Sequence, residues 1–448
     1  MRADLRLAWL LTRGSDRREW WRIGLTALGA AMATGIGLAA VSLASLDGYY
    51  SVSVGSGLLD SDSDRRGVIF ALGLLLIPVL GFLGQCARIG AVHRDRRLAA
   101  LRLAGAAPGQ VRRIAALESG PACLAGSVAA TAVFVPLWSH PTAPAWAGFA
   151  LVAAAVPVLG AAVSALSLHR VVASPLGWVR RVRATRGPGR LFKSVTWLLA
   201  ATLLFIVVAP VFSDSFAFTH GPLTLIVLTL LISFTAVWLS GSSSRQLGEG
   251  LAARARRPEV LIAAERLRED PWAAARTHAA VLLVTVVGSG FVGVRQVLLA
   301  ELHTMRREGH LAADLAYYTT GIDLTATAIL VALALILTSL AVGAAESLAT
   351  RRRGLAAQAA AGVPHGVLAR ALLLETALPL APAVAVAGIG GLGISAWYAS
   401  VATDYIVAPV PYAALLVPFA VYACCLLAAA TSIPLLRRSV RPAELRYA

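Results

Sequence analysis

Apolar residues run along this chain in long blocks rather than with the short period of soluble amphipathic helices. A helix that crosses the hydrocarbon core of a bilayer needs about 20 such residues, and ten blocks approach or exceed that length. They predict membrane-spanning helices at 22–46, 67–90, 116–138, 145–169, 194–212, 221–241, 277–297, 323–348, 371–397 and 411–436. Prolines interrupt the third and the ninth block (Pro121 and Pro379), and neighbouring helices can accommodate such breaks. We therefore predict an all-α polytopic membrane protein.

The composition agrees with a chain that lies mostly in lipid. Hydrophobic residues make up 58% of the 448 residues and charged residues only 14%, whereas soluble domains have about 25% charged residues. The 4 cysteines lie in or beside apolar blocks without CxxC spacing, so we interpret them as buried thiols rather than as a zinc site or a disulfide framework. The first apolar block is longer than the core of a signal peptide and is expected to remain as a membrane helix.

The basic residues fix the predicted orientation. The chain has 40 of them and a net charge of +17, and nearly all lie at the termini or in alternate gaps between the apolar blocks. The exceptions are Arg65, Arg66, Arg295, Arg306 and Arg307. Positively charged loops stay in the cytoplasm, so we predict that both termini are cytoplasmic. The same distribution favours contact with membrane lipid and disfavours binding of nucleic acid, and the abundance of arginine and alanine is typical of a high-GC bacterium, which predicts the bacterial cytoplasmic membrane.

The gaps on the opposite side are short, so no large extracytoplasmic domain is expected. The longest, between the seventh and the eighth block, has about 28 residues and a helical pattern. It either extends the seventh helix outward or lies along the membrane surface.

An internal repeat is visible in two basic segments, 94–118 and 351–375. Identical residues recur 257 positions apart without a gap: Arg96 and Arg353, Leu98 and Leu355, Ala99 and Ala356, Ala100 and Ala357, Gly105 and Gly362, Arg113 and Arg370, Glu118 and Glu375. We infer two four-helix repeats joined by two spacer helices. The predicted domains are residues 1–170, the linker 171–255 and residues 256–448.

Each segment predicts a short helix, a tight turn and entry into the next membrane helix. In the first, Arg94 to Ala104 forms a helix near the membrane surface, Gly105 ends it with a positive φ, and Pro108 begins the next helix. A single basic loop of this kind would be interpreted as a grip on anionic lipid headgroups. Two matching copies favour contact with a two-fold symmetric soluble partner.

The pattern of a basic cluster, Leu-Ala-x-x-Arg-x-x-Gly-Ala, Gln-Val-Arg-Arg and a glutamate-headed helix resembles the FtsX-like (MacB-type) permease domain of ABC transporters. The segment from Arg96 to Glu118 matches better than the segment from Arg351 to Glu375. The layout of four, two and four helices is similar to that of BceB-type permeases, in which one chain supplies both halves.

The resemblance implies that both segments are coupling helices that dock on a nucleotide-binding subunit. The residues assigned to this ATPase coupling are Arg96, Leu98, Leu101, Arg102, Gly105, Arg113, Glu118, Arg353, Leu355, Gly362, Arg370 and Glu375. The implied partner is an ABC ATPase in two copies, which carries ATP and Mg, while this chain binds no cofactor or metal. Two features depart from the family: Arg97 and Gly354 stand where a glutamate is common, and no large domain follows the seventh helix. A small extracytoplasmic partner would then supply substrate capture.

Catalytic motifs are absent from the sequence. A phosphate-binding loop needs GxxxxGK[ST], and the single lysine, Lys193, follows Phe192 where glycine is required. The grouping of Glu301, His303 and His310 is interpreted as a solvated helix face rather than as a metal site. We predict a non-enzymatic membrane subunit of an ATP-driven exporter of an amphiphile such as an antibiotic, a peptide or a lipid. The alternatives are a non-transporting membrane regulator and an ion-driven carrier.

Overall fold

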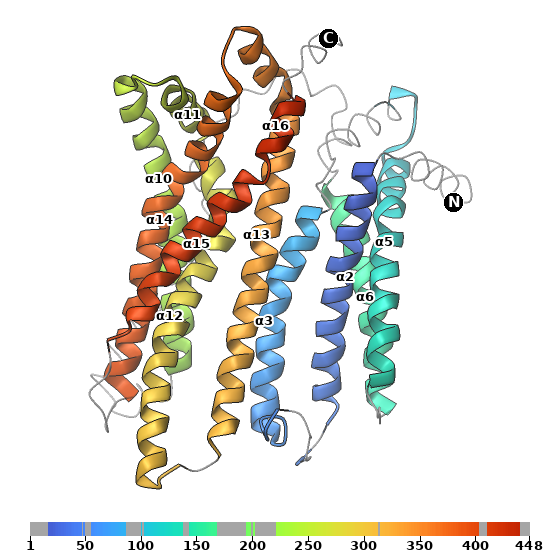
Figure 1. The fold of residues 1–448 in the computed structure, drawn as a ribbon. Coiled ribbons are helices and arrows are strands. Elements are labelled where there is room, and N and C mark those ends of the chain that lie inside the picture. Colours follow the sequence, from blue (N-terminus) through green and yellow to red (C-terminus); the bar gives the residue numbers. More distant parts are fainter. Residues whose placement is uncertain are drawn as a thin grey trace. The chain divides into compact units, whose positions relative to one another are not determined.

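All regular secondary structure in the described part of the chain is helical (Figure 1). The computed structural model describes residues 17–46, 48–49, 55–86, 100, 103–137, 143–167, 194–198, 200–201, 221–311, 314–402 and 410–439. Within these ranges no strand occurs, and 9 helices are long and apolar enough to cross a membrane. The protein is therefore an all-α, multi-pass membrane protein.

These 9 helices correspond to nine of the ten predicted blocks. Helix α5 (Pro108–Leu137) continues through Pro121, and α14 (His365–Ala402) continues through Pro379 and Pro382. The prolines therefore do not break either helix. Most of the predicted fifth block, 194–212, lies outside the described residues.

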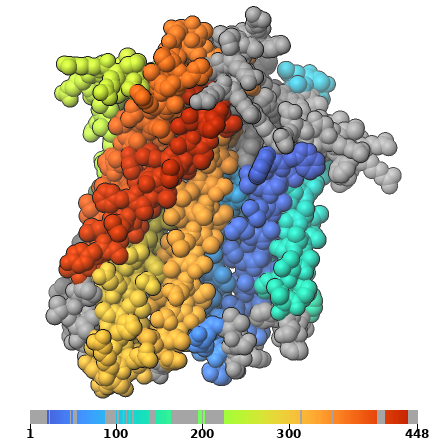
Figure 2. Space-filling model, viewed as in Figure 1, coloured from blue at the N-terminus to red at the C-terminus, as the bar shows by residue number. Residues whose placement is uncertain are grey.

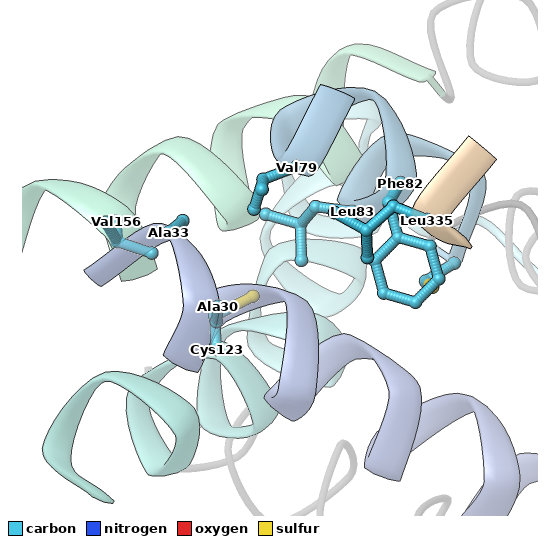
Figure 3. Packing of buried hydrophobic residues seen from close by; sticks show 9 residues of the cluster. Ala30, Ala33, Val79, Phe82, Leu83, Cys123, Val156 and Leu335 are labelled. Carbon is cyan, nitrogen blue, oxygen red and sulfur yellow. The ribbon is translucent and has the colours of Figure 1, made fainter. Parts of the chain in front are cut away.

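The helices divide into two compact units. The first unit comprises Met1–Val182 and Ala316–Glu346. In it, α2 (Arg17–Ala44) packs on α3 (Asp62–Cys86), α5 and α6 (Ala143–Ser167). Its main apolar core joins residues from these four helices to one residue of α13 (Leu315–Ala360). Figure 3 shows this core. It consists of Ala30, Ala33, Val79, Phe82, Leu83, Cys86, Cys123, Val156 and Leu335.

Glycines allow the helices of the first unit to approach closely. A Cβ atom added at Gly126 of α5 would lie 2.8 Å from the carbonyl carbon of Ala27 and 3.0 Å from the amide nitrogen of Ala31 in α2, and closer still to the Ala27 oxygen. Small residues at such crossings are typical of membrane helices, whose association depends on close packing rather than on exclusion of water.

The second unit comprises Arg183–Leu315 and Ser347–Ala448. Its central helix, α14, packs on four helices of the unit, α10, α11, α12 and α15, and also contacts α16. Their bounds are Gly221–Arg254, Pro258–Glu269, Trp272–Glu308, Tyr412–Ala430 and Ile433–Ser439. At the crossing of α12 and α14, a Cβ atom on Gly391 would lie 2.8 Å from the Val286 oxygen and 2.9 Å from the Gly290 nitrogen. Here too a glycine of one helix meets the backbone of the other.

Three helices run well beyond the apolar blocks that predict them. Helix α10 continues from residue 241 to Arg254, and α13 continues from residue 348 to Ala360. The added residues are mostly good helix formers and include no proline, so the helix continues until Pro258 or Gly362 follows. Helix α12 extends to Glu308, where Gly309 ends it with φ of 75°. Of the two alternatives for the gap after the seventh block, the structure shows continuation of the helix, while its outward direction stays a prediction.

Candidate functional site

The second basic segment, 351–375, lies within the described residues. It contains a tight turn between α13 and α14. The backbone N–H of Gly362 donates to the Ala359 carbonyl at 2.9 Å, and that of Val363 donates to the Gln358 carbonyl at 3.1 Å. Gly362 has φ of 90°, a conformation that glycine adopts without a steric penalty. This pair of hydrogen bonds is the Schellman arrangement that satisfies the last carbonyls of a helix. The segment is therefore the end of the long helix α13, where the sequence predicts a separate short helix.

The turn before α5 has matching backbone geometry. Gly105 has φ of 97°. The N–H of Ala104 donates to Ala100 at 2.9 Å, as that of Ala361 donates to Ala357 at 3.0 Å. The N–H of Gln110 donates to Ala107 at 3.0 Å, as that of Val367 donates to Pro364 at 3.0 Å. Each pair of equivalent residues is separated by the same 257 positions as the sequence repeat, and so are the first residues of α5 and α14, Pro108 and His365.

An apolar cluster packs against the α13–α14 turn. Leu348 and Leu355 of α13 pack with Leu368 of α14 and Leu436 of α16, and all four are nearly fully buried. Ile262 of α11 packs against the same cluster. Leu355, which the sequence assigns to partner contact, is only 3% exposed, so it holds the turn in place rather than facing a partner.

Ion pairs connect the turn to its neighbouring helices. The Glu375 carboxylate of α14 accepts from the Arg351 guanidinium of α13 at 2.6 Å and from the Arg266 guanidinium of α11 at 3.2 Å. Arg370 and Glu259 form a longer pair at 3.9 Å. Because three helices share these contacts and Glu375 is largely buried, the turn is held as one body with α11.

The solvent-exposed side of the turn is basic. Arg353, Gly362, His365 and Arg370 are all exposed, and Figure 2 shows this orange region at the molecular surface. No described carboxylate pairs with Arg353. The arrangement offers a basic surface on which Arg353 has no carboxylate partner among the described residues.

Of the other predicted coupling residues, several lie outside the described residues. These are Arg96, Leu98, Leu101 and Arg102, together with the side chain of Glu118. Arg113 is exposed on α5. The sequence missed Arg266, Arg351 and Glu259, which complete the ion pairs. The sequence repeat gave a signal for the Arg351–Glu375 pair, because Arg351 and Glu375 are separated by the same interval as Arg94 and Glu118.

Within the described ranges, no group of three or more His, Cys, Asp or Glu side chains could hold a metal ion. His303 and His310 are exposed, whereas Glu301 is buried in α12.

Comparisons with protein-family models, with curated proteins and with solved structures found no match to this chain. The fold thus defines the class of protein, a multi-pass helical membrane protein.

Proposed function

We propose that this chain is the membrane subunit of an ATP-driven ABC transporter and that the two turns are its docking points for a separate ATPase. The observation that carries the proposal is the matching backbone geometry at Gly105 and Gly362, at equal spacing in the sequence. Two turns with matching backbone geometry suit a partner that acts as a two-fold symmetric pair. The sequence resemblance to FtsX-like permeases supports the same assignment.

The construction of the turn suits force transmission. Its exposed tip is continuous with α13 and α14, both of which cross the membrane, and the buried leucines and ion pairs resist local yielding. Movement of a bound ATPase would therefore displace the membrane helices rather than bend the turn. ATP and Mg would bind to the partner, because the chain has no phosphate-binding loop.

The direction of transport and the cargo belong to the same proposal. The turns would face the cytoplasm of a bacterium, as the distribution of arginine predicts. Closure of the ATPases would move the opposite ends of the helices and expel an amphiphile such as an antibiotic, a peptide or a lipid. A regulator that relays ATPase motion to an outer partner would bind the ATPase in the same way but move no substrate.

We expect Gly105→Val and Gly362→Val each to weaken ATPase binding about tenfold or more, and the double variant to abolish it. A β-branched residue at these positive φ values costs about 1–3 kcal/mol of local strain, so the turn must change shape. The measurement is the affinity of the purified ABC ATPase encoded nearest to this chain for the chain in nanodiscs. Gly354→Ala is the control, since Gly354 is exposed with no atom within 4 Å of an added Cβ. Wild-type affinity in both glycine variants would reject the proposal.

A further inference from the structure

A second basic surface lies at the corner between α10 and α11. Arg254, Arg256 and Arg257 are all exposed there, and none has a carboxylate partner among the described residues. Other arginines of the same region are paired at close range, for example Arg245 with Glu249 at 3.0 Å and Arg268 with Glu265 at 2.7 Å. The corner thus concentrates arginines that no described carboxylate neutralises.

The predicted end of the apolar block at residue 241 places the arginines of the corner beyond the expected reach of lipid headgroups. Arg254 follows the end of the predicted block at residue 241 by 13 helical residues, which is about 20 Å at the α-helical rise. The headgroup layer adds only about 5–7 Å on each side of the hydrocarbon core, and ordinary helix tilt changes the height little. The same count gives the α13–α14 turn an equal expected height, because Ala361 follows residue 348 by the same number of residues.

The corner and the turn belong to one rigid body. Helix α11 buries Ala263, Ala264 and Leu267 and packs on α14. The Arg266–Glu375 and Arg370–Glu259 pairs connect it directly to α14. In Figure 1 the α10–α11 corner and the α13–α14 turn lie at the same end of the second unit. A soluble partner that rests on the turn therefore meets the corner in a fixed position.

We propose that the α10–α11 corner is a second docking surface for the same soluble ATPase and contacts a carboxylate-rich part of it. This inference rests on the proposed function. Charge complementarity identifies the partner surface as acidic, and the expected distance of the corner from the bilayer favours protein over lipid. The corner would raise the rate and the specificity of docking, while the turn transmits movement, because exposed charge pairs act mainly on association.

The test compares Arg256→Glu/Arg257→Glu with Arg306→Glu/Arg307→Glu. Both variants reverse two adjacent exposed arginines, and the control pair lies in the last turn of α12. Affinity for the purified ATPase is measured in nanodiscs of phosphatidylcholine, with and without phosphatidylglycerol, over a range of salt concentrations. We expect about a tenfold loss for the corner variant in both lipids, a weaker salt dependence of binding, and no loss for the control. Unchanged size-exclusion profiles and thermal midpoints show that both variants are folded.

Three results would overturn the inference, and they separate it from the proposed function. Suppose the corner variant binds the ATPase like the wild type while Gly362→Val loses binding. This result rejects the corner as a docking surface and leaves the proposed function intact. Loss confined to phosphatidylglycerol discs assigns the corner to lipid. Wild-type binding by the corner variant, by Gly105→Val and by Gly362→Val rejects both the inference and the proposed function.

Discussion

Replacing Gly126 with valine is expected to prevent the first unit from assembling. The position lies at the crossing of α5 with α2, where the Ala27 carbonyl and the Ala31 amide of α2 occupy the space that a Cβ would need. Backbone atoms cannot rotate away as the end of a side chain can, so the helices must separate. Overpacking of a tight core costs about 1–3 kcal/mol and sometimes more, and the contact with backbone places this variant at the upper end.

The yield of monodisperse protein and its thermal midpoint measure this effect. Gly120→Ala is the matched control in the same helix, because the nearest atom to its added Cβ is the Ala161 Cβ at 4.0 Å. We expect Gly126→Ala to be intermediate and Gly120→Ala to match the wild type. A Gly126→Val variant with wild-type yield and midpoint would show that α2 and α5 do not cross at this glycine.

Replacing Arg65 with methionine is expected to destabilise the loop between α2 and α3 and to lower the free energy of unfolding by about 3–5 kcal/mol. Arg65 is only 1% exposed. Its guanidinium donates to the Leu59 carbonyl at 3.1 Å, to the Asp60 carbonyl at 2.9 Å and to the Leu46 carbonyl at 3.1 Å, and it also reaches the Gly48 carbonyl. Methionine has a similar length but no donor, so four carbonyl groups lose their partner.

Thermal unfolding and limited proteolysis of the segment 46–61 check this expectation. Arg66→Met is the control, because Arg66 is the next residue, is 77% exposed and, among the described residues, pairs only with Asp62 at 2.6 Å. An exposed pair of this kind contributes about 0–1 kcal/mol. Equal midpoints and equal cleavage for the two variants would contradict the structural role of Arg65.

Arg65 also explains an exception in the distribution of charge along the sequence. It is one of five basic residues on the predicted outer side, where the positive-inside bias disfavours arginine. The structure buries it among backbone carbonyls, so it stabilises a turn and does not bear on orientation. Arg306 and Arg307 lie in the last turn of α12, where positive charge is favourable beside the helix C-terminus.

The helices were predictable because the apolar blocks are long and few polar residues interrupt them. The conformation of Gly105 and Gly362 was predictable as well, since a glycine after a helix and before a proline or a new helix start is a strong C-terminal signal. The lengths of α10 and α13 were not predicted, because hydropathy ends where the lipid ends while helix propensity continues into water.

Helix α11 and its ion pairs were missed for a different reason. The helix is short and carries both charges, so it resembles a basic linker, although Pro258 at its start and the spacing of Glu259, Ala263 and Leu267 fit one buried face. The Arg266–Glu375 pair joins residues 109 positions apart. Sequence patterns report local periodicity, and such a contact depends on how helices pack.

The most direct test of the proposed docking is the number of ATPase subunits that one chain binds. The chain would be isolated through its own tag with the co-expressed ABC ATPase encoded nearest to it, and the intact complex would be weighed by native mass spectrometry. The matching turns at Gly105 and Gly362 predict two ATPase subunits for each chain. A folded, monodisperse chain that binds no ATPase would contradict the proposed function, and one ATPase per chain would contradict the equivalence of the two turns.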